Sequence, residues 1–247
     1  MSHLLQNPKT TAKKFLLVIV KFFNKCWTKG CIPSAWKEAV VVPVQKPGKP
    51  ADLTSSYRGI ALICHFGKLY ESVVGNRLVQ ELETKEIIPR CQAGFRKNRN
   101  CMEHVVHLVE EAKKIKSQNR SLAATFFDIK KAFDTVWHGK LLDKMKKLGF
   151  SGNLYNFVKA FLTERMIEVK VGSATSTKHT LDMGVPQGSV IAPILFTLML
   201  HDIETAVNDP NFTLSLFADD LAIWRAIVNR KKWCEKAYQP MIDKIAK

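Results

Sequence analysis

The sequence is short of acidic residues and lacks the cysteine patterns of zinc sites. Its 247 residues include 22 Asp and Glu against 38 Lys and Arg, a formal net charge of +16. Such a surplus favours a polyanionic partner, most often nucleic acid. None of the six cysteines forms a C-x-x-C pair, and no Cys/His set has zinc spacing. We therefore expect reduced thiols in an intracellular protein.

Long apolar runs are also missing. The longest uncharged run covers residues 190–200, which is too short to cross a bilayer. The apolar stretch at 15–20 is interrupted by Lys21 and has no small-residue cleavage site after it, so we expect a buried helix and no signal peptide. No repeat or low-complexity segment is seen. The length suits one large domain or two subdomains.

Hydrophobic spacing predicts an alternation of helices and strands. The helix over 67–83 should bury Leu69, Val73, Leu78 and Leu82, and Asp134 should cap the helix that precedes Gly149. A basic helix is expected over 230–247. The remaining predicted helices cover 10–27, 103–118, 154–162 and 190–203, and the predicted strands cover 36–44, 122–129 and 167–171.

The other elements are arranged around residues 214–224, where two apolar arms enclose Asp219 and Asp220. We expect two buried strands joined by a turn. Adjacent carboxylates repel each other near apolar surface, and a divalent cation such as Mg²⁺ removes that penalty. Taken alone, such a pair is more often an acidic turn without a function.

Several other segments allow both a functional and a structural interpretation. The loop at 46–50 and the side chain of Arg58 suit a phosphate, a solvated turn or an ion pair. The basic stretch 92–99 suits a nucleic-acid backbone or an exposed loop. Asp128 ends an apolar strand and needs a partner. The glycines of 183–189 allow close approach of a substrate, or only a strand-to-helix turn.

Taken in order, eight short stretches resemble the reverse transcriptase domain of non-LTR (LINE-type) retrotransposons. The resemblance runs from about residue 30 to the end of the chain, and its specificity comes from the ordered set. Phe217 stands where the family usually has Tyr, and Gly59 stands where Pro is frequent. The stretches are IPSAWK (32–37), KPGKP (46–50), SYR (56–58), GKLYE (67–71), QAGFR (92–96), FDIKKAFD (127–134), GVPQGS (184–189) and FADD (217–220).

The resemblance implies an α+β fold, a right-hand polymerase with fingers over 1–120 and palm over 121–247. The palm would be an antiparallel sheet backed by helices, with Asp128 beside Asp219 and Asp220. No thumb is recognised within the chain.

The implied activity is RNA-directed DNA synthesis with two Mg²⁺ ions, or Mn²⁺, as cofactor. The implied partners are an RNA template, a DNA primer and dNTP. Catalytic roles fall to Asp128, Asp219 and Asp220, which would hold the metal with the carbonyl of Ile129. Nucleotide contacts fall to Lys46, Arg58, Phe133, Pro186, Gln187 and Gly188, and template contacts to Gln92, Gly94, Phe95 and Arg96.

Phe133 would be the gate that excludes ribonucleotides; plain core packing is the alternative. Two other functions stay open for the whole chain. It could be a truncated, non-catalytic remnant that binds RNA or DNA through charge without metal. It could also be a nucleotide cyclase, which uses a related palm, although the 92–96 and 186–189 stretches argue against that.

Overall fold

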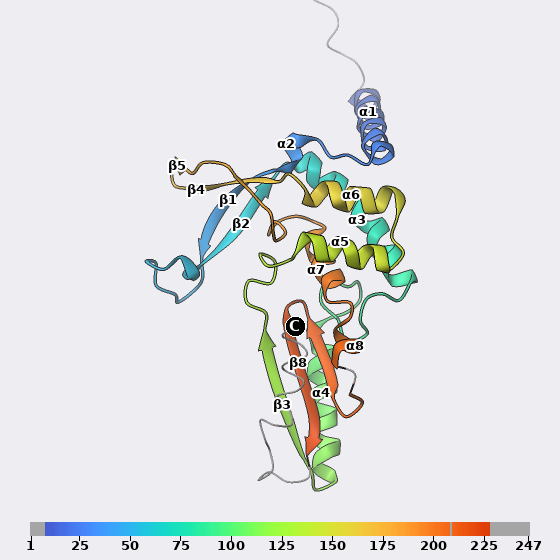
Figure 1. Ribbon diagram of the computed structural model, residues 1–247, viewed down its shortest axis with the longest axis vertical. Coiled ribbons are helices and arrows are strands. Elements are labelled where there is room, and N and C mark those ends of the chain that lie inside the picture. The colour runs from blue at the N-terminus through green and yellow to red at the C-terminus, as the bar shows by residue number, and fades with distance from the viewer. Residues whose placement is uncertain (1–7, 208, 228–247) are drawn as a thin grey trace, which may run out of the picture. The chain divides into compact units, whose positions relative to one another are not determined.

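The computed structural model describes residues 8–207 and 209–227 (Figure 1). The chain divides into two compact units, and each unit combines two segments. Unit 1 comprises Met1–Leu78 and Trp137–Val190, and unit 2 comprises Val79–Val136 and Ile191–Lys247. The labels fingers and palm over 1–120 and 121–247 stay predictions.

Unit 1 is built on a mixed sheet. Its strands are β1 (Glu38–Gln45), β2 (Tyr57–Ile63), β4 (Met166–Val171), β5 (Ala174–Thr175) and β6 (His179–Thr180). Strand β1 pairs with β2 in antiparallel and with β4 in parallel orientation, and β4 pairs with β5 and β6. The helices of this unit are α1 (Pro8–Lys29), α2 (Ser34–Lys37), most of α3 (His65–Thr84), α5 (His138–Lys147) and α6 (Gly152–Leu162), with the 3₁₀ turn η1 at Thr54–Ser56.

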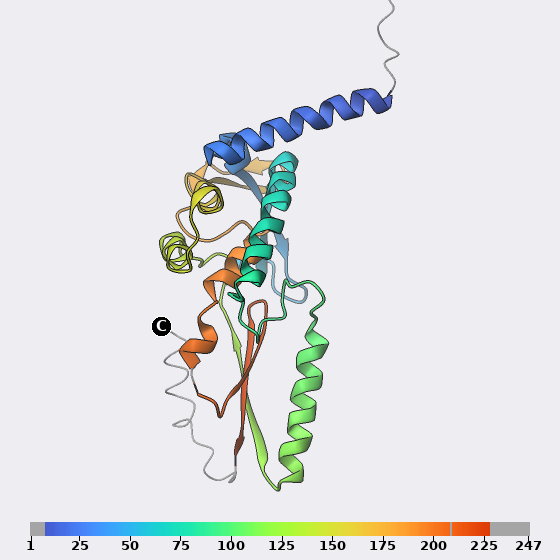
Figure 2. The same ribbon diagram turned by 90° about the vertical axis from the view of Figure 1, so that its right-hand side faces the viewer.

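An aromatic cluster holds the helices of unit 1 together. The Tyr70 ring lies 5.4 Å from Phe157 of α6 and 5.0 Å from Phe23 of α1, measured between ring centroids. Such ring pairs add to the stabilisation from buried apolar area. Figure 2 shows α1 extending beyond the rest of this unit, and its Phe15 and Val18 side chains are exposed.

Unit 2 contains a three-stranded antiparallel sheet in the order β3 (Ser121–Asp128), β8 (Asp220–Ile227), β7 (Thr213–Phe217). Its helices are α4 (Cys101–Ser117), α7 (Ala192–Met199) and α8 (Ile203–Val207). One face of the sheet buries Leu216, Leu221 and Ile223 with Val207 of α8 and Phe212. On α4, Glu111 accepts hydrogen bonds from Trp224 Nε1 at 2.6 Å and Thr213 Oγ1 at 3.3 Å. The predicted α+β class with an antiparallel sheet is confirmed.

Four local predictions need correction. The helix over 15–20 forms within α1 but is not buried, because the Phe15, Leu17 and Val18 side chains are all more than half exposed. The buried face of α3 comprises Tyr70, Val74, Leu78 and Leu82, spaced four residues apart, whereas Leu69 and Val73 are 48% and 43% exposed. The helix expected over 190–203 is interrupted and forms α7 and α8. Asp134 does not cap α5, because the N-cap position belongs to Trp137.

The basic helix expected over 230–247 lies outside the described residues. Among the residues that are described, no helix combines the length and the hydrophobicity of a bilayer span.

Candidate active-site residues

The two adjacent carboxylates lie at a tight hairpin in unit 2. Strands β7 and β8 are joined by Ala218 and Asp219 alone, and Phe217 pairs with Asp220. Two-residue hairpin turns need backbone with positive φ, which glycine and asparagine supply most easily. Here Ala218 takes this role with φ of +58°. A side chain in that region carries strain that its surroundings must hold in place.

The third carboxylate lies across the sheet from this hairpin. Asp128, the last residue of β3, pairs with Asp220, the first residue of β8. Figure 1 shows β3 and β8 side by side. Directly opposed residues of antiparallel strands have Cα atoms roughly 4.5–5.5 Å apart. Asp128 and Asp220 are exposed and Asp219 is half-exposed. The fold therefore brings the three carboxylates to one end of the sheet, as the resemblance implies.

The chemistry of this end of the sheet fits Mg²⁺. No ion pair or side-chain hydrogen bond joins Asp128, Asp219 or Asp220 to another described residue. Within the described part of the chain, no three Asp, Glu, His or Cys side chains are placed so that together they could hold a metal ion. Mg²⁺ usually binds one or two carboxylates and completes its shell with water and phosphate oxygens. Exposed carboxylates that form no ion pair with a described cation suit this way of binding Mg²⁺. Ile129, whose carbonyl is the other predicted metal ligand, directly follows β3.

Phe133 lies in the same unit, in the turn that follows β3. Its ring stacks on Phe196 of α7 at 5.3 Å and meets Phe95 edge-on at 6.3 Å. Phe196 is buried, whereas Phe133 is only half-buried. Packing on one side and partial exposure on the other agree with both interpretations of this ring.

The template contacts predicted for the 92–96 stretch stay predictions, and three of the four residues are already engaged within the protein. Gln92 is fully buried. Gly94 lies against the hairpin, where an added Cβ would come within 2.2 Å of the Ala218 nitrogen. Arg96 donates from Nε and Nη2 to the two carboxylate oxygens of Glu83, at 2.9 and 2.6 Å. Only Phe95, 48% exposed, still offers its side chain to a ligand.

In unit 1 the loop containing Pro186, Gln187 and Gly188 is fixed against β2. The Ala61 nitrogen donates to the Gln187 carbonyl at 2.7 Å. Pro186 is buried, Gln187 is half-buried and Gly188 is exposed. Backbone rather than side chain is thus the main surface that this loop offers.

Sequence reasoning missed the residue that holds the end of this loop. Glu71 of α3 is buried and accepts hydrogen bonds from Ser189 Oγ at 2.7 Å and from the Val190 nitrogen at 2.8 Å. Burial lowers the pKa of Arg165 to about 10, and the charge of Glu71 acts in the opposite direction. The available signal was the position of Glu71 in the GKLYE stretch, within a helix expected to be mostly core.

Gly188→Ala should destabilise unit 1 by about 2 kcal/mol or more. Gly188 has φ of +135°, and an added Cβ would meet the Ala61 carbonyl oxygen at 2.4 Å. Gly48→Ala is the matched control, because Gly48 also has positive φ but no atom within 4 Å of the added Cβ. Urea unfolding followed by circular dichroism measures both. An equal loss of unfolding free energy in the two variants would refute the close packing of the loop against Ala61.

Lys46 and Arg58 lie together on the β1–β2 hairpin of unit 1. Arg58 is exposed and pairs in register with Val44. Lys46 is half-buried, and its Nζ donates to the Ser55 carbonyl at 3.1 Å. Both cations are therefore available at one hairpin, and their binding of a triphosphate stays a prediction.

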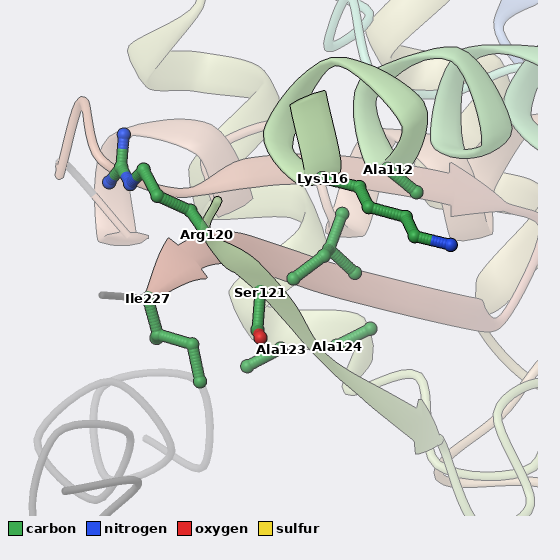
Figure 3. A pocket seen from close by; sticks show the side chains of 8 residues that line it. Ala112, Lys116, Arg120, Ser121, Ala123, Ala124 and Ile227 are labelled. Carbon is green, nitrogen blue, oxygen red and sulfur yellow. The ribbon is translucent and has the colours of Figure 1, made fainter. Parts of the chain in front are cut away.

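Unit 2 also contains a cavity of about 600 Å³ (Figure 3). Its wall ends at Ala124, four positions before Asp128, which is roughly 13 Å along a strand. It contains two cations and no acid, so it is not the metal site. The lining residues are Ala112, Lys116, Arg120, Ser121, Leu122, Ala123, Ala124 and Ile227.

An antiparallel sheet with one carboxylate opposite a carboxylate hairpin is what the resemblance predicts for the palm of a right-hand polymerase. A family model described as "Reverse transcriptase (RNA-dependent DNA polymerase)" matches residues 44–247. The chain belongs to this reverse transcriptase family.

The related curated proteins are polymerases of mobile elements. The chain is 35% identical over 217 residues to the RNA-directed DNA polymerase from mobile element jockey of Drosophila melanogaster, covering 86% of this chain and 23% of that protein. It is 32% identical over 220 residues to the probable RNA-directed DNA polymerase from transposon BS of the same organism, covering 87% and 24%. The predicted likeness to non-LTR retrotransposon enzymes is confirmed. The chain spans about a quarter of the length of these relatives.

Solved structures with a similar fold include telomerases. Apo telomerase from Candida tropicalis, truncated from its C-terminal domain, matches with a TM-score of 0.58 and 13% identity over 95% of this chain and 52% of that one. Telomerase of the same organism in complex with a TWJ fragment of telomeric RNA matches with a TM-score of 0.60 and 12% identity, covering 94% and 42%. These likenesses support the fold alone.

Proposed function

We propose that this chain is the polymerising part of an RNA-directed DNA polymerase of a retrotransposon. Its substrates would be dNTP and the 3′-hydroxyl of a DNA primer on an RNA or DNA template. The observation that carries the proposal is the pairing of Asp128 with Asp220 beside the Asp219 turn, in a chain of the reverse transcriptase family.

Asp128 and Asp219, with the carbonyl of Ile129, would hold the divalent metal, and Asp220 would contribute mainly its charge. When bound, two Mg²⁺ ions supply stabilisation of the charge on the attacking and leaving oxygens. The protein residues would hold that chemistry in place at one end of the sheet of unit 2.

The remaining residues would bind and select the nucleotide. Arg58, which is exposed, and Lys46, which is half-buried on the same hairpin, would attract the triphosphate. Gly188 would let the backbone of its loop approach the nucleotide closely. Phe95 would stack on a template base, as exposed aromatic rings do on single strands.

A primer-extension assay tests the proposal. The chain should extend a DNA primer on an RNA template with Mg²⁺ or Mn²⁺, and chelation of the metal should stop extension. If hybrid binding is tight but extension stays absent with either metal, the alternative of a non-catalytic nucleic-acid-binding protein is favoured. Its supporting observation is the formal net charge of +16.

Phe133→Val should raise incorporation of ribonucleotides about tenfold or more relative to deoxynucleotides. A gate acts by sterically excluding the 2′-hydroxyl, and such steric selection is worth roughly 1–3 kcal/mol. Phe15→Val, at an exposed ring of α1 outside all the predicted sites, is the control and should leave the ratio unchanged. The ratio of kcat/KM for matched rNTP and dNTP measures the effect. An unchanged ratio in Phe133→Val would leave the ring as plain packing.

The cysteines bear on location. Cys26, Cys31, Cys64, Cys91 and Cys101 are free thiols in the described part of the chain. Reduced cysteines are the usual state inside cells, which supports an intracellular location as part of the proposal.

A further inference from the structure

The outer edge of β7 is paired with a short segment from a distant part of the chain. The Ala93 nitrogen donates to the Leu216 carbonyl at 2.9 Å, and the Leu216 nitrogen donates to the Cys91 carbonyl at 2.9 Å. Gln92 and Leu216 thus form an isolated parallel bridge within unit 2. Without this segment, β7 would present an unpaired edge.

The Gln92 side chain extends this pairing to the hairpin turn. Its Oε1 accepts a hydrogen bond from the Ala218 nitrogen at 3.1 Å, and its Nε2 donates to the Ala218 carbonyl at 3.3 Å. Oε1 also accepts from the Gly94 nitrogen at 2.7 Å. A carboxamide both donates and accepts, as a peptide group does, so Gln92 continues the ladder with its side chain where the backbone of its own segment turns away.

Three observations indicate that the turn depends on this contact. Ala218 has a positive φ that an L-residue adopts at a cost, and such conformations persist when neighbours fix them. Gln92 is 0% exposed, so water cannot substitute for its amide. Gly94 permits the close approach, because any Cβ there would overlap the Ala218 backbone.

The segment that carries Gln92 is itself anchored. Glu204 accepts a hydrogen bond from the Cys91 nitrogen at 2.7 Å, and Arg96 forms its two-pronged ion pair with Glu83 of α3. Arg96 Nη1 also donates to the Gln92 carbonyl at 3.2 Å. We call the hydrogen bonds of the Gln92 side chain to Ala218 and Gly94 the clamp. The segment that carries the clamp is thus held by contacts on both sides of Gln92.

We propose that Gln92 is a positioning residue, whose buried amide fixes the Ala218 turn and so places the two following carboxylates, Asp219 and Asp220, for metal binding. The metal part of this inference rests on the proposed function. The clamp itself does not, and the two parts are measured separately.

Hydrogen exchange of the 247-residue chain tests the clamp. Gln92→Met keeps the length of the side chain and removes all three hydrogen bonds. The Ala218 and Gly94 amides should exchange at least about tenfold faster, while the Ile223 amide in the middle of β8 keeps its protection, because opening is local. Gln92→Glu keeps an acceptor and should have a smaller effect. Gln80→Met, at an exposed glutamine of the same unit, is the control.

Mn²⁺ titration tests the consequence for the carboxylates. The half-saturating Mn²⁺ concentration should rise about tenfold in Gln92→Met, as is common when a group that orients metal ligands is removed. Val207→Ala, a cavity variant in the sheet core, should lower the unfolding midpoint and leave Mn²⁺ affinity unchanged. This comparison separates positioning from a general loss of stability.

The exchange and Mn²⁺ measurements decide separately on the clamp and on its role in placing the carboxylates. Unchanged exchange at Ala218 in both Gln92 variants would overturn the clamp. Faster exchange with unchanged Mn²⁺ affinity would retain the clamp and overturn its role in placing the carboxylates. Failure of the wild-type chain to bind Mn²⁺ would overturn the metal site of the proposed function and the positioning role with it, but not the clamp. If Gln92→Met unfolds, Gln92→Glu decides.

Discussion

Asp219→Asn should lower the rate of primer extension by about a thousandfold or more. The metal ions of nucleotidyl transfer contribute several kcal/mol of charge stabilisation, and about 4 kcal/mol corresponds to that factor. Asp128→Asn should have an effect of similar size, because Asp128 lies across the sheet at the same end. Single-turnover extension on an RNA template measures both, with circular dichroism to show that each variant is folded.

The control for these substitutions is Asp143→Asn. Asp143 is an exposed carboxylate of α5 in unit 1, so the variant changes net charge equally without touching the sheet of unit 2. It should extend primers at the wild-type rate. Primer extension at the wild-type rate by Asp219→Asn would contradict the assignment of the catalytic carboxylates, even though the chain belongs to the reverse transcriptase family.

Affinity for an RNA–DNA hybrid should fall about a thousandfold between about 50 and about 200 mM KCl. This drop corresponds to about six neutralised phosphates, because each contact releases condensed counterions. The +16 charge makes contacts of that number reasonable. Fluorescence anisotropy at a series of salt concentrations gives the slope, and a shallow slope would contradict the inferred polyanion-binding surface.

The same titration separates the polymerase from a charged remnant. A polymerase should hold the hybrid more tightly when Mg²⁺ and the next complementary dNTP are present, and Asp219→Asn should lose this gain. A remnant that binds through charge alone should show the salt slope without any response to the nucleotide.

The hairpin was the best-determined feature of the sequence. Two apolar arms around Asp219 and Asp220 allow few structures besides a buried β-hairpin, because the length of the turn sets the register in which the two strands pair. The pairing with Asp128 came from the family resemblance, since no local pattern joins residues so far apart in the chain. The structure places them opposite each other in register.

Neither the buried face of α3 nor the partners of the buried Gln92 side chain could be predicted from the sequence. Leu69 and Tyr70 are adjacent on α3, and choosing the buried one requires knowledge of the aromatic rings around it. Gln92 reads as a polar loop residue next to basic neighbours, and only the approach of β7 turns it inward. Tertiary contacts decided both positions.

The most direct test of the account is Mn²⁺ binding followed by electron paramagnetic resonance. We predict a saturable site in the wild-type chain that is lost in Asp128→Asn and in Asp219→Asn, and kept in Asp143→Asn. Loss in both variants would mean that carboxylates from distant segments share one metal. Wild-type binding by Asp128→Asn would contradict the central claim that β3 and the β7–β8 turn build the metal site together.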